Sequence, residues 1–108
     1  MKAFKNHNGR GFFLTFPNGV RLSTQFGWAN YCENYDFNLP VEVEMKKTDW
    51  ESNDAEIAIF SPSGEWITKQ FDDSEDDVLG HVSMTKWLKA LDFCRKWKPS
   101  RKAAGKES

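Results

Sequence analysis

Residues 12–26 carry the pattern that most limits how this chain can fold. Apolar side chains recur at every second position on both sides of Pro17-Asn18-Gly19, and a period of two residues predicts β-strands. The three intervening residues match a type I turn followed by a glycine in the left-handed conformation. A loop of this length pairs Leu14 with Leu22, whereas a two-residue loop would set apolar side chains opposite polar ones. The stretch is therefore predicted to form an antiparallel hairpin.

Further strands are predicted on both sides of this hairpin. A short strand is expected near Ala3-Phe4-Lys5, and Val41–Met45 alternates apolar residues with charged ones, as in a strand with a solvent-facing side. The segment Ala55–Phe60 is apolar on both faces after its glutamate. This pattern favours a central strand.

A second turn of the same design follows this central strand. Pro62-Ser63-Gly64 repeats the Pro-x-Gly order of the first turn, and a loop of that length pairs Phe60 with Trp66. The sequence therefore predicts a second hairpin, whose outer strand runs from Glu65 to Phe71.

The C-terminal part of the chain has the period of a helix. Ser83 is a favourable N-cap, and Pro99 would end the helix. One apolar stripe is formed by Met84, Trp87, Leu88, Leu91, Cys94 and Trp97. An amphipathic helix over residues 83–97 is predicted to pack this stripe on the sheet.

Together these elements predict an α+β fold: an antiparallel sheet of about five strands, built from two hairpins, with one C-terminal amphipathic helix packed on a face. A chain of 108 residues is long enough to bury one core. Residues 1–98 are therefore expected to form a single globular domain, and residues 99–108 to form a disordered basic tail.

Composition narrows the possible environments and partners. The formal net charge of -1 argues against a generic nucleic-acid binder or a membrane-surface binder. The sequence shows no secretory leader and no apolar run long enough to cross a membrane, so a cytoplasmic protein with reduced thiols is expected. A disulfide between Cys32 and Cys94 is the alternative.

The stretch that most suggests function is Gln25–Asn34, directly after the first hairpin. It combines aromatic rings, a thiol and side-chain amides on a predicted turn, which is typical of a segment that contacts a partner. The candidate binding residues are Phe26, Trp28, Asn30, Tyr31, Cys32 and Asn34. The same side chains also suit a cap over one end of the core, with the asparagines fixing backbone turns, and both interpretations stay open.

The acidic run is a second candidate contact. Its carboxylates are Asp72, Asp73, Glu75, Asp76 and Asp77. They form either a solvated loop or a phosphate-like surface that contacts a basic partner. The run lacks the residue order of a calcium loop, and the cysteines and histidines are too scattered for a zinc site. Neither a metal nor another cofactor is predicted.

Two alternatives to protein binding remain. A nucleotide or nucleic-acid binding module would use exposed aromatic rings beside cations, here Phe13, Arg21 and Trp28. That function requires a bare sheet face, whereas a sheet in so aromatic a domain is expected to be covered on both faces. A cysteine-dependent enzyme would need Cys32 activated by a nearby histidine, and no motif supplies one. The chain is therefore predicted not to be an enzyme.

Five short strings carry a resemblance to known proteins. They are Phe16-Pro17-Asn18-Gly19, Ser23-Thr24-Gln25-Phe26-Gly27, Asn30-Tyr31-Cys32-Glu33-Asn34, Glu56-Ile57-Ala58-Ile59-Phe60 and Gly64-Glu65-Trp66. Over residues 12–91 the chain resembles a family of small, uncharacterised proteins of tailed bacteriophages. The resemblance implies a phage-encoded protein in the host bacterial cytoplasm, of a class that often binds and inhibits host or host-defence proteins. The expected mechanism of such a binding protein is occlusion rather than turnover. It assigns no catalytic residues.

Overall fold

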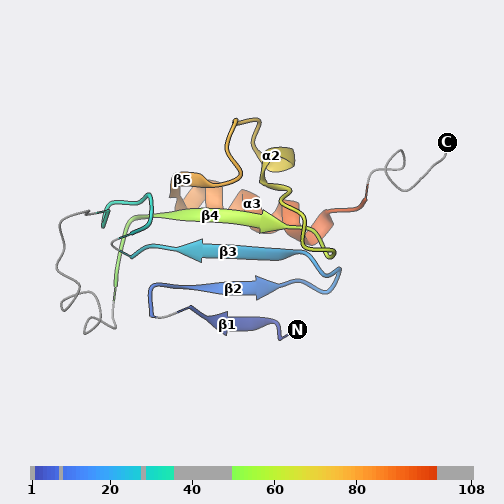
Figure 1. Cartoon of the computed structure of the whole chain (residues 1–108), viewed down its shortest axis with the longest axis horizontal. Helices are drawn as coiled ribbons and strands as arrows, with labels where there is room; N and C mark the ends of the chain where they lie inside the picture. The colour runs from blue at the N-terminus through green and yellow to red at the C-terminus, as the bar shows by residue number, and fades with distance from the viewer. Residues whose placement is uncertain (1, 8, 28, 36–49, 100–108) are drawn as a thin grey trace.

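The structure, a computed structural model, describes residues 2–7, 9–27, 29–35 and 50–99. Within these ranges the chain forms a five-stranded antiparallel sheet in the order β1-β2-β3-β4-β5, and one helix lies across a face of it (Figure 1). The elements are β1 (Phe4–Asn6), β2 (Gly11–Thr15), β3 (Arg21–Gln25), β4 (Asp54–Phe60), α2 (Thr68–Phe71), β5 (Leu79–Ser83) and α3 (Met84–Lys96). The predicted α+β class is confirmed.

The first hairpin forms as predicted. Leu14 pairs with Leu22 across β2 and β3, and Gly19 adopts a φ of 90°, the left-handed conformation that this turn requires. Asn18 in the turn donates from Nδ2 to the Cys94 carbonyl at 2.9 Å. The turn is therefore tied to the C-terminal end of α3, where helix carbonyls lack intrahelical partners.

The second predicted hairpin forms only at its turn. Phe60 bridges to Trp66, as expected, but the prediction of a strand continuing to Phe71 is wrong because Thr68–Phe71 forms α2. The Thr68 hydroxyl accepts the Ile59 N–H at 2.9 Å. A side-chain oxygen thus replaces the backbone acceptor of a strand, and the chain turns into a helix.

The outer strand next to β4 is β5, which the sequence pattern did not predict. Val82 pairs with Ala55 and Leu79 with Ile57, and the register shifts between these two pairs. His81 lies at the shift with a φ of 52°. An extra residue of this kind breaks the alternation by which strands are recognised.

α3 begins at the predicted cap, where Ser83 Oγ accepts a backbone N–H of the first turn at 3.2 Å. Its buried centre is Ala90 and Cys94, both 0% exposed. The larger side chains packed around them are Trp87, Leu91, Phe93 and Trp97. Met84 and Leu88, predicted on the buried stripe, are instead 62% and 54% exposed. The small Ala90 faces the sheet, so the buried stripe is rotated away from these two residues.

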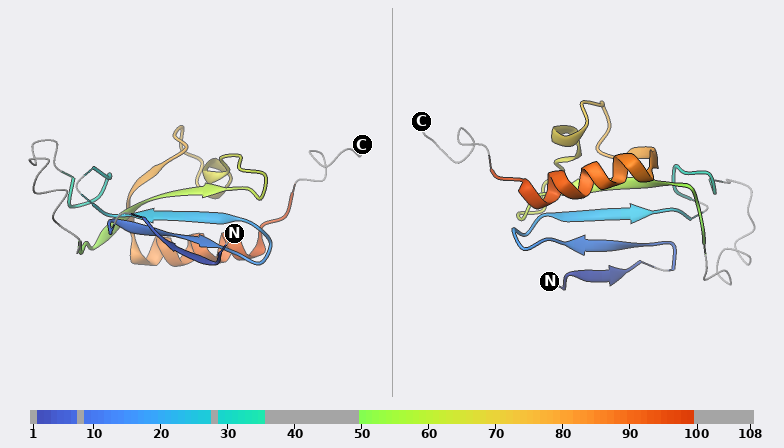
Figure 2. Two further views of the ribbon diagram at one scale, coloured as in Figure 1. Left: turned by 60° about the horizontal axis from the view of Figure 1, so that its bottom comes forward. Right: turned by 180° about the vertical axis from the view of Figure 1, so that it is seen from behind.

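The sheet has one covered face and one open face. The core lies between the sheet and α3 and consists of Val20, Leu22, Ile57, Ile59, Ile67, Leu79, Val82, Ala90 and Cys94. On the opposite face, no described segment crosses β1, β2 or β3 (Figures 1 and 2). The expectation of a sheet covered on both faces is therefore not met by the described residues.

Three predictions fall outside the described residues: the strand at Val41–Met45, the placement of Trp28, and the tail beyond Pro99. The two described helices, α2 and α3, contain 4 and 13 residues. No helix in the described part of the chain is long and apolar enough to cross a membrane.

Candidate binding site

Two asparagines hold the loop that follows β3. Asn30 is 6% exposed, its Oδ1 accepts the Gly27 N–H at 2.8 Å, and its Nδ2 donates to Glu56 Oε1 at 2.9 Å. Asn34 Nδ2 donates to the Phe26 carbonyl at 2.6 Å. These amides fix the backbone of the loop against β4. The interpretation of the loop as a cap over one end of the core expected this role for the asparagines.

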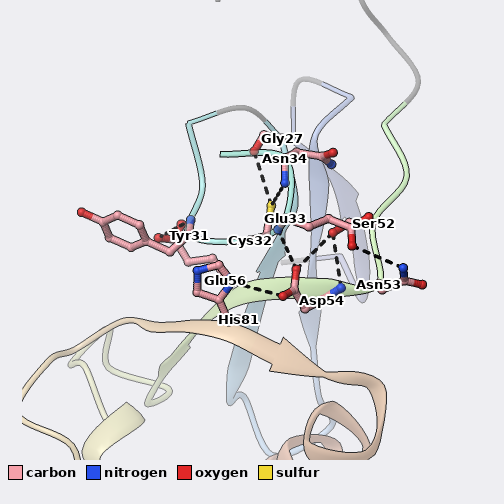
Figure 3. Close-up of polar contacts among 10 residues, drawn as sticks. All are labelled: Gly27, Tyr31, Cys32, Glu33, Asn34, Ser52, Asn53, Asp54, Glu56 and His81. Atoms are coloured by element: carbon pink, nitrogen blue, oxygen red, sulfur yellow. Dashed lines mark hydrogen bonds and ion pairs between the residues drawn. The ribbon is translucent and has the colours of Figure 1, made fainter. Parts of the chain in front are cut away.

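The Cys32 thiol is enclosed by the same loop. It is 1% exposed, and its sulfur lies 3.5 Å from the Gly27 carbonyl oxygen and 3.4 Å from the Asn34 nitrogen (Figure 3). Burial raises the pKa of Cys32, and it raises the pKa of Cys94 to about 12. Both cysteines are free and buried, so neither presents the accessible thiolate of a reactive cysteine.

Asp54 joins the loop to β5. Its Oδ1 accepts the Glu33 N–H at 2.7 Å and the Ser52 hydroxyl at 3.2 Å, while its Oδ2 lies 3.1 Å from His81 Nδ1 (Figure 3). Burial alone would raise the pKa of Asp54, but the hydrogen bonds from Glu33, His81 and Ser52 outweigh it and the pKa is lowered. Sequence reasoning missed this contact because its two partners are 27 residues apart and no local pattern links them.

Tyr31 is exposed, whereas the other described candidate residues of the loop are buried or half-buried. Its side of the loop meets β5, since its carbonyl accepts the His81 N–H at 2.7 Å, and the residue is 52% exposed. A pocket of about 520 Å³, here called the Tyr31 pocket, is lined by Tyr31, Asp76, Asp77, Val78, Gly80 and His81. The fold thus brings together two stretches that the sequence singled out separately, the loop and the acidic run.

The acidic run is only partly neutralised. Asp72 forms an ion pair with Lys86 of α3, and Asp77 lies 3.9 Å from Lys69 Nζ. The members that are exposed and have no ion-pair partner within the described ranges are Asp73, Glu75 and Asp76. The rim of the Tyr31 pocket therefore carries negative charge.

Phe26, another predicted binding residue, does not join Tyr31. It lines a mainly apolar pocket of about 330 Å³ near the start of α3, together with Phe12 and Trp87. The predicted loop set is thereby divided between this apolar pocket, the hydrogen-bonded interior of the loop, and the outward-facing ring of Tyr31.

Two of the residues predicted for nucleic-acid binding, Phe13 and Arg21, lie on the open face of the sheet. Arg21 Cζ is 5.1 Å from the centroid of the Phe13 ring, and both side chains are half-buried. Two of the three residues named for that alternative are therefore neighbours, while Trp28 lies outside the described residues.

Within the described residues, no group of three or more His, Cys, Asp or Glu side chains is placed to hold a metal ion. Comparison of the chain with protein-family models, curated proteins and solved structures gives no match.

Proposed function

We propose that this chain is a small binding protein that occupies the surface of a partner protein, with Tyr31 at the centre of the contact. The observation that carries the proposal is the exposed Tyr31 ring beside the carboxylates of Asp76 and Asp77. Tyrosine is among the residues most often found as interface anchors. A partner with a basic segment fits this combination best.

The backbone on both sides of the Tyr31 ring is fixed. Its N–H donates to Glu56 Oε2 at 3.4 Å, and its carbonyl accepts from His81 at 2.7 Å. Its ring also lies 5.2 Å from the ring of Tyr35, measured between centroids. A side chain held in this way loses little conformational freedom when a partner binds, which favours affinity.

The negative charge on the rim of the Tyr31 pocket favours a partner with a positively charged contact surface. A lysine or arginine that contacts Asp76 can also lie over the Tyr31 ring, where an exposed cation–π contact contributes about 0.5–1 kcal/mol. Such contacts weaken as salt rises, because the Debye length falls from about 10 Å at 0.1 M to about 3 Å at 1 M. Binding is therefore expected to weaken over this range.

We infer occlusion rather than turnover. Nδ1 of His81 is held by Asp54, and the Cys32 thiol is shielded by its own loop. The resemblance to proteins of tailed bacteriophages extends the proposal to a host or host-defence protein of the bacterial cytoplasm as the partner. Its inhibition would follow from covering a functional surface.

Affinity capture from bacterial lysate, with and without phage infection, tests the proposal. The native chain is compared with Tyr31→Ala and Asp76→Asn, each checked for folding by circular dichroism. Glu65→Gln, which removes one exposed carboxylate outside the acidic run, is the matched charge control. We expect Tyr31→Ala to lose the captured protein, Asp76→Asn to retain less of it, and Glu65→Gln to match the native chain. Equal retention by Tyr31→Ala would contradict the proposal.

A further inference from the structure

A continuous row of rings and one cation crosses the open face of the sheet. Arg21 lies opposite Phe60 in the register, with its Cζ 5.1 Å from the Phe13 ring centroid and 6.0 Å from the Phe60 centroid. The Phe60 and Trp66 centroids are 4.6 Å apart. These four residues, here called the aromatic row, extend from β2 across β3 and β4 to Trp66, which is 51% exposed.

Among the described residues, the guanidinium in the aromatic row has no anionic partner. The Nε atom of Arg21 is buried without a hydrogen-bond partner, and within the described ranges no carboxylate forms an ion pair with this residue. Guanidinium groups characteristically form paired hydrogen bonds to carboxylates or phosphates. An unpaired guanidinium between two rings therefore suits a ligand that combines a flat ring with a negative charge.

A hollow of about 250 Å³ adjoins the aromatic row. Its walls include the rings of Phe13, Phe60 and Trp66 and the polar side chains of Ser23, Gln25 and Glu56. The rings offer stacking surfaces. Gln25 and Glu56 each accept a hydrogen bond from Asn30, and their remaining hydrogen-bonding capacity can serve the edge of a base. Lys5, the exposed cross-strand neighbour of Phe13, supplies a second cation on this face.

We propose that the open face binds single-stranded nucleic acid, with bases stacked along the aromatic row and phosphates at Arg21 and Lys5. Aromatic platforms next to cations are how proteins bind single strands without reading their sequence. A duplex hides the faces of its bases and so does not fit the aromatic row. The hollow shares Val78 with the lining of the Tyr31 pocket, but none of the residues assigned here to bases or phosphates lines that pocket.

The small number of cations predicts a shallow salt dependence. For single strands, log K falls with log salt by about 0.7 per neutralised phosphate. Contacts at Arg21 and Lys5 then give a slope of about -1.4, or about a sevenfold loss of affinity between roughly 50 and 200 mM salt. With Arg21 removed, one contact remains, and the same change in salt costs only about 2.6-fold.

Fluorescence anisotropy of a labelled oligothymidylate, titrated with the full chain over this salt range, tests the site. Arg21→Gln should weaken binding and halve the slope, whereas Arg95→Gln, which removes an exposed arginine from α3, should leave both unchanged. Trp66→Ala should weaken binding about fivefold or more, the lower end of the contribution of one stacked base. Tyr31→Ala should bind the oligonucleotide as the native chain does, which separates this site from the proposed protein contact.

Partial unfolding of Arg21→Gln would lower the apparent affinity by the same factor at every salt concentration, because only the folded fraction binds. It would therefore not produce the expected halving of the salt slope. Four outcomes would overturn the proposal: no binding at low salt, equal slopes for Arg21→Gln and Arg95→Gln, duplex bound as tightly as single strand, or thymidine monophosphate bound as tightly as the oligonucleotide. The last result would mean that the face takes one planar anion rather than a strand.

Discussion

Replacing Asn30 with alanine removes the side chain that does most to hold the loop beneath Tyr31. Its amide makes three hydrogen bonds, from the Gly27 N–H at 2.8 Å, to Gln25 Oε1 at 3.1 Å and to Glu56 Oε1 at 2.9 Å. At a net contribution of about 1 kcal/mol each, their loss lowers the free energy of unfolding by about 3 kcal/mol. The loss is large because the Gly27 N–H is buried and is left without this partner.

Urea unfolding followed by tryptophan fluorescence measures this change. For a chain of this size, a loss of about 3 kcal/mol also lowers the melting temperature by about 10–20 °C. Asn53→Ala is the matched control, because its amide makes one exposed 3.3 Å bond to Glu33, and it should change stability by less than about 0.5 kcal/mol. A loss below about 1 kcal/mol for Asn30→Ala, or equal losses for both variants, would refute the assignment of Asn30 as the anchor of the loop.

Three further predictions concern the contacts around this loop. Gly80→Ala places a Cβ 2.6 Å from Tyr31 Cβ, so it should lower the free energy of unfolding by about 1–3 kcal/mol and speed hydrogen exchange at the His81 N–H. Unchanged protection of this N–H would count against the close contact. Because the folded pKa of Asp54 lies below its ordinary 3.8, its carboxylate stabilises the fold above that pH and loses this effect as pH falls through the folded pKa. Asp54→Asn should therefore flatten the decline of unfolding free energy in urea titrations below pH 3.8, and coincident profiles would contradict this. Neither thiol should react with Ellman's reagent before unfolding, and rapid modification of native Cys32 would show that its loop opens.

The parts of the fold that could be predicted are those in which local chemistry and pairing agree. The turn at Pro17-Asn18-Gly19 and the pairing of Leu14 with Leu22 gave one register, and the structure has it. The cap at Ser83 likewise marks the start of α3. Each of these signals is complete within a short stretch of sequence, so no distant residue is needed to interpret it.

The parts that could not be predicted depend on distant partners or on broken periodicity. The bulge at His81 breaks the alternation of side chains by which β5 could have been recognised. The Thr68 hydroxyl ends a strand by accepting the Ile59 N–H, and strand or helix propensities do not predict this bond. In the loop, composition marked the right stretch but did not separate Asn30, which is buried, from Tyr31, which is exposed. Only the tertiary contact with β5 makes that distinction.

Site-specific photo-crosslinking at position 31 tests the central claim most directly. A photoreactive phenylalanine analogue replaces Tyr31 in one sample and Leu88, 54% exposed on α3, in the other, and both are irradiated in bacterial lysate. We predict a covalent adduct with one protein from position 31 that becomes weaker as salt rises, and none from position 88. An adduct from position 88 with none from position 31 would place the partner on α3 and contradict the assignment of Tyr31 as the binding centre.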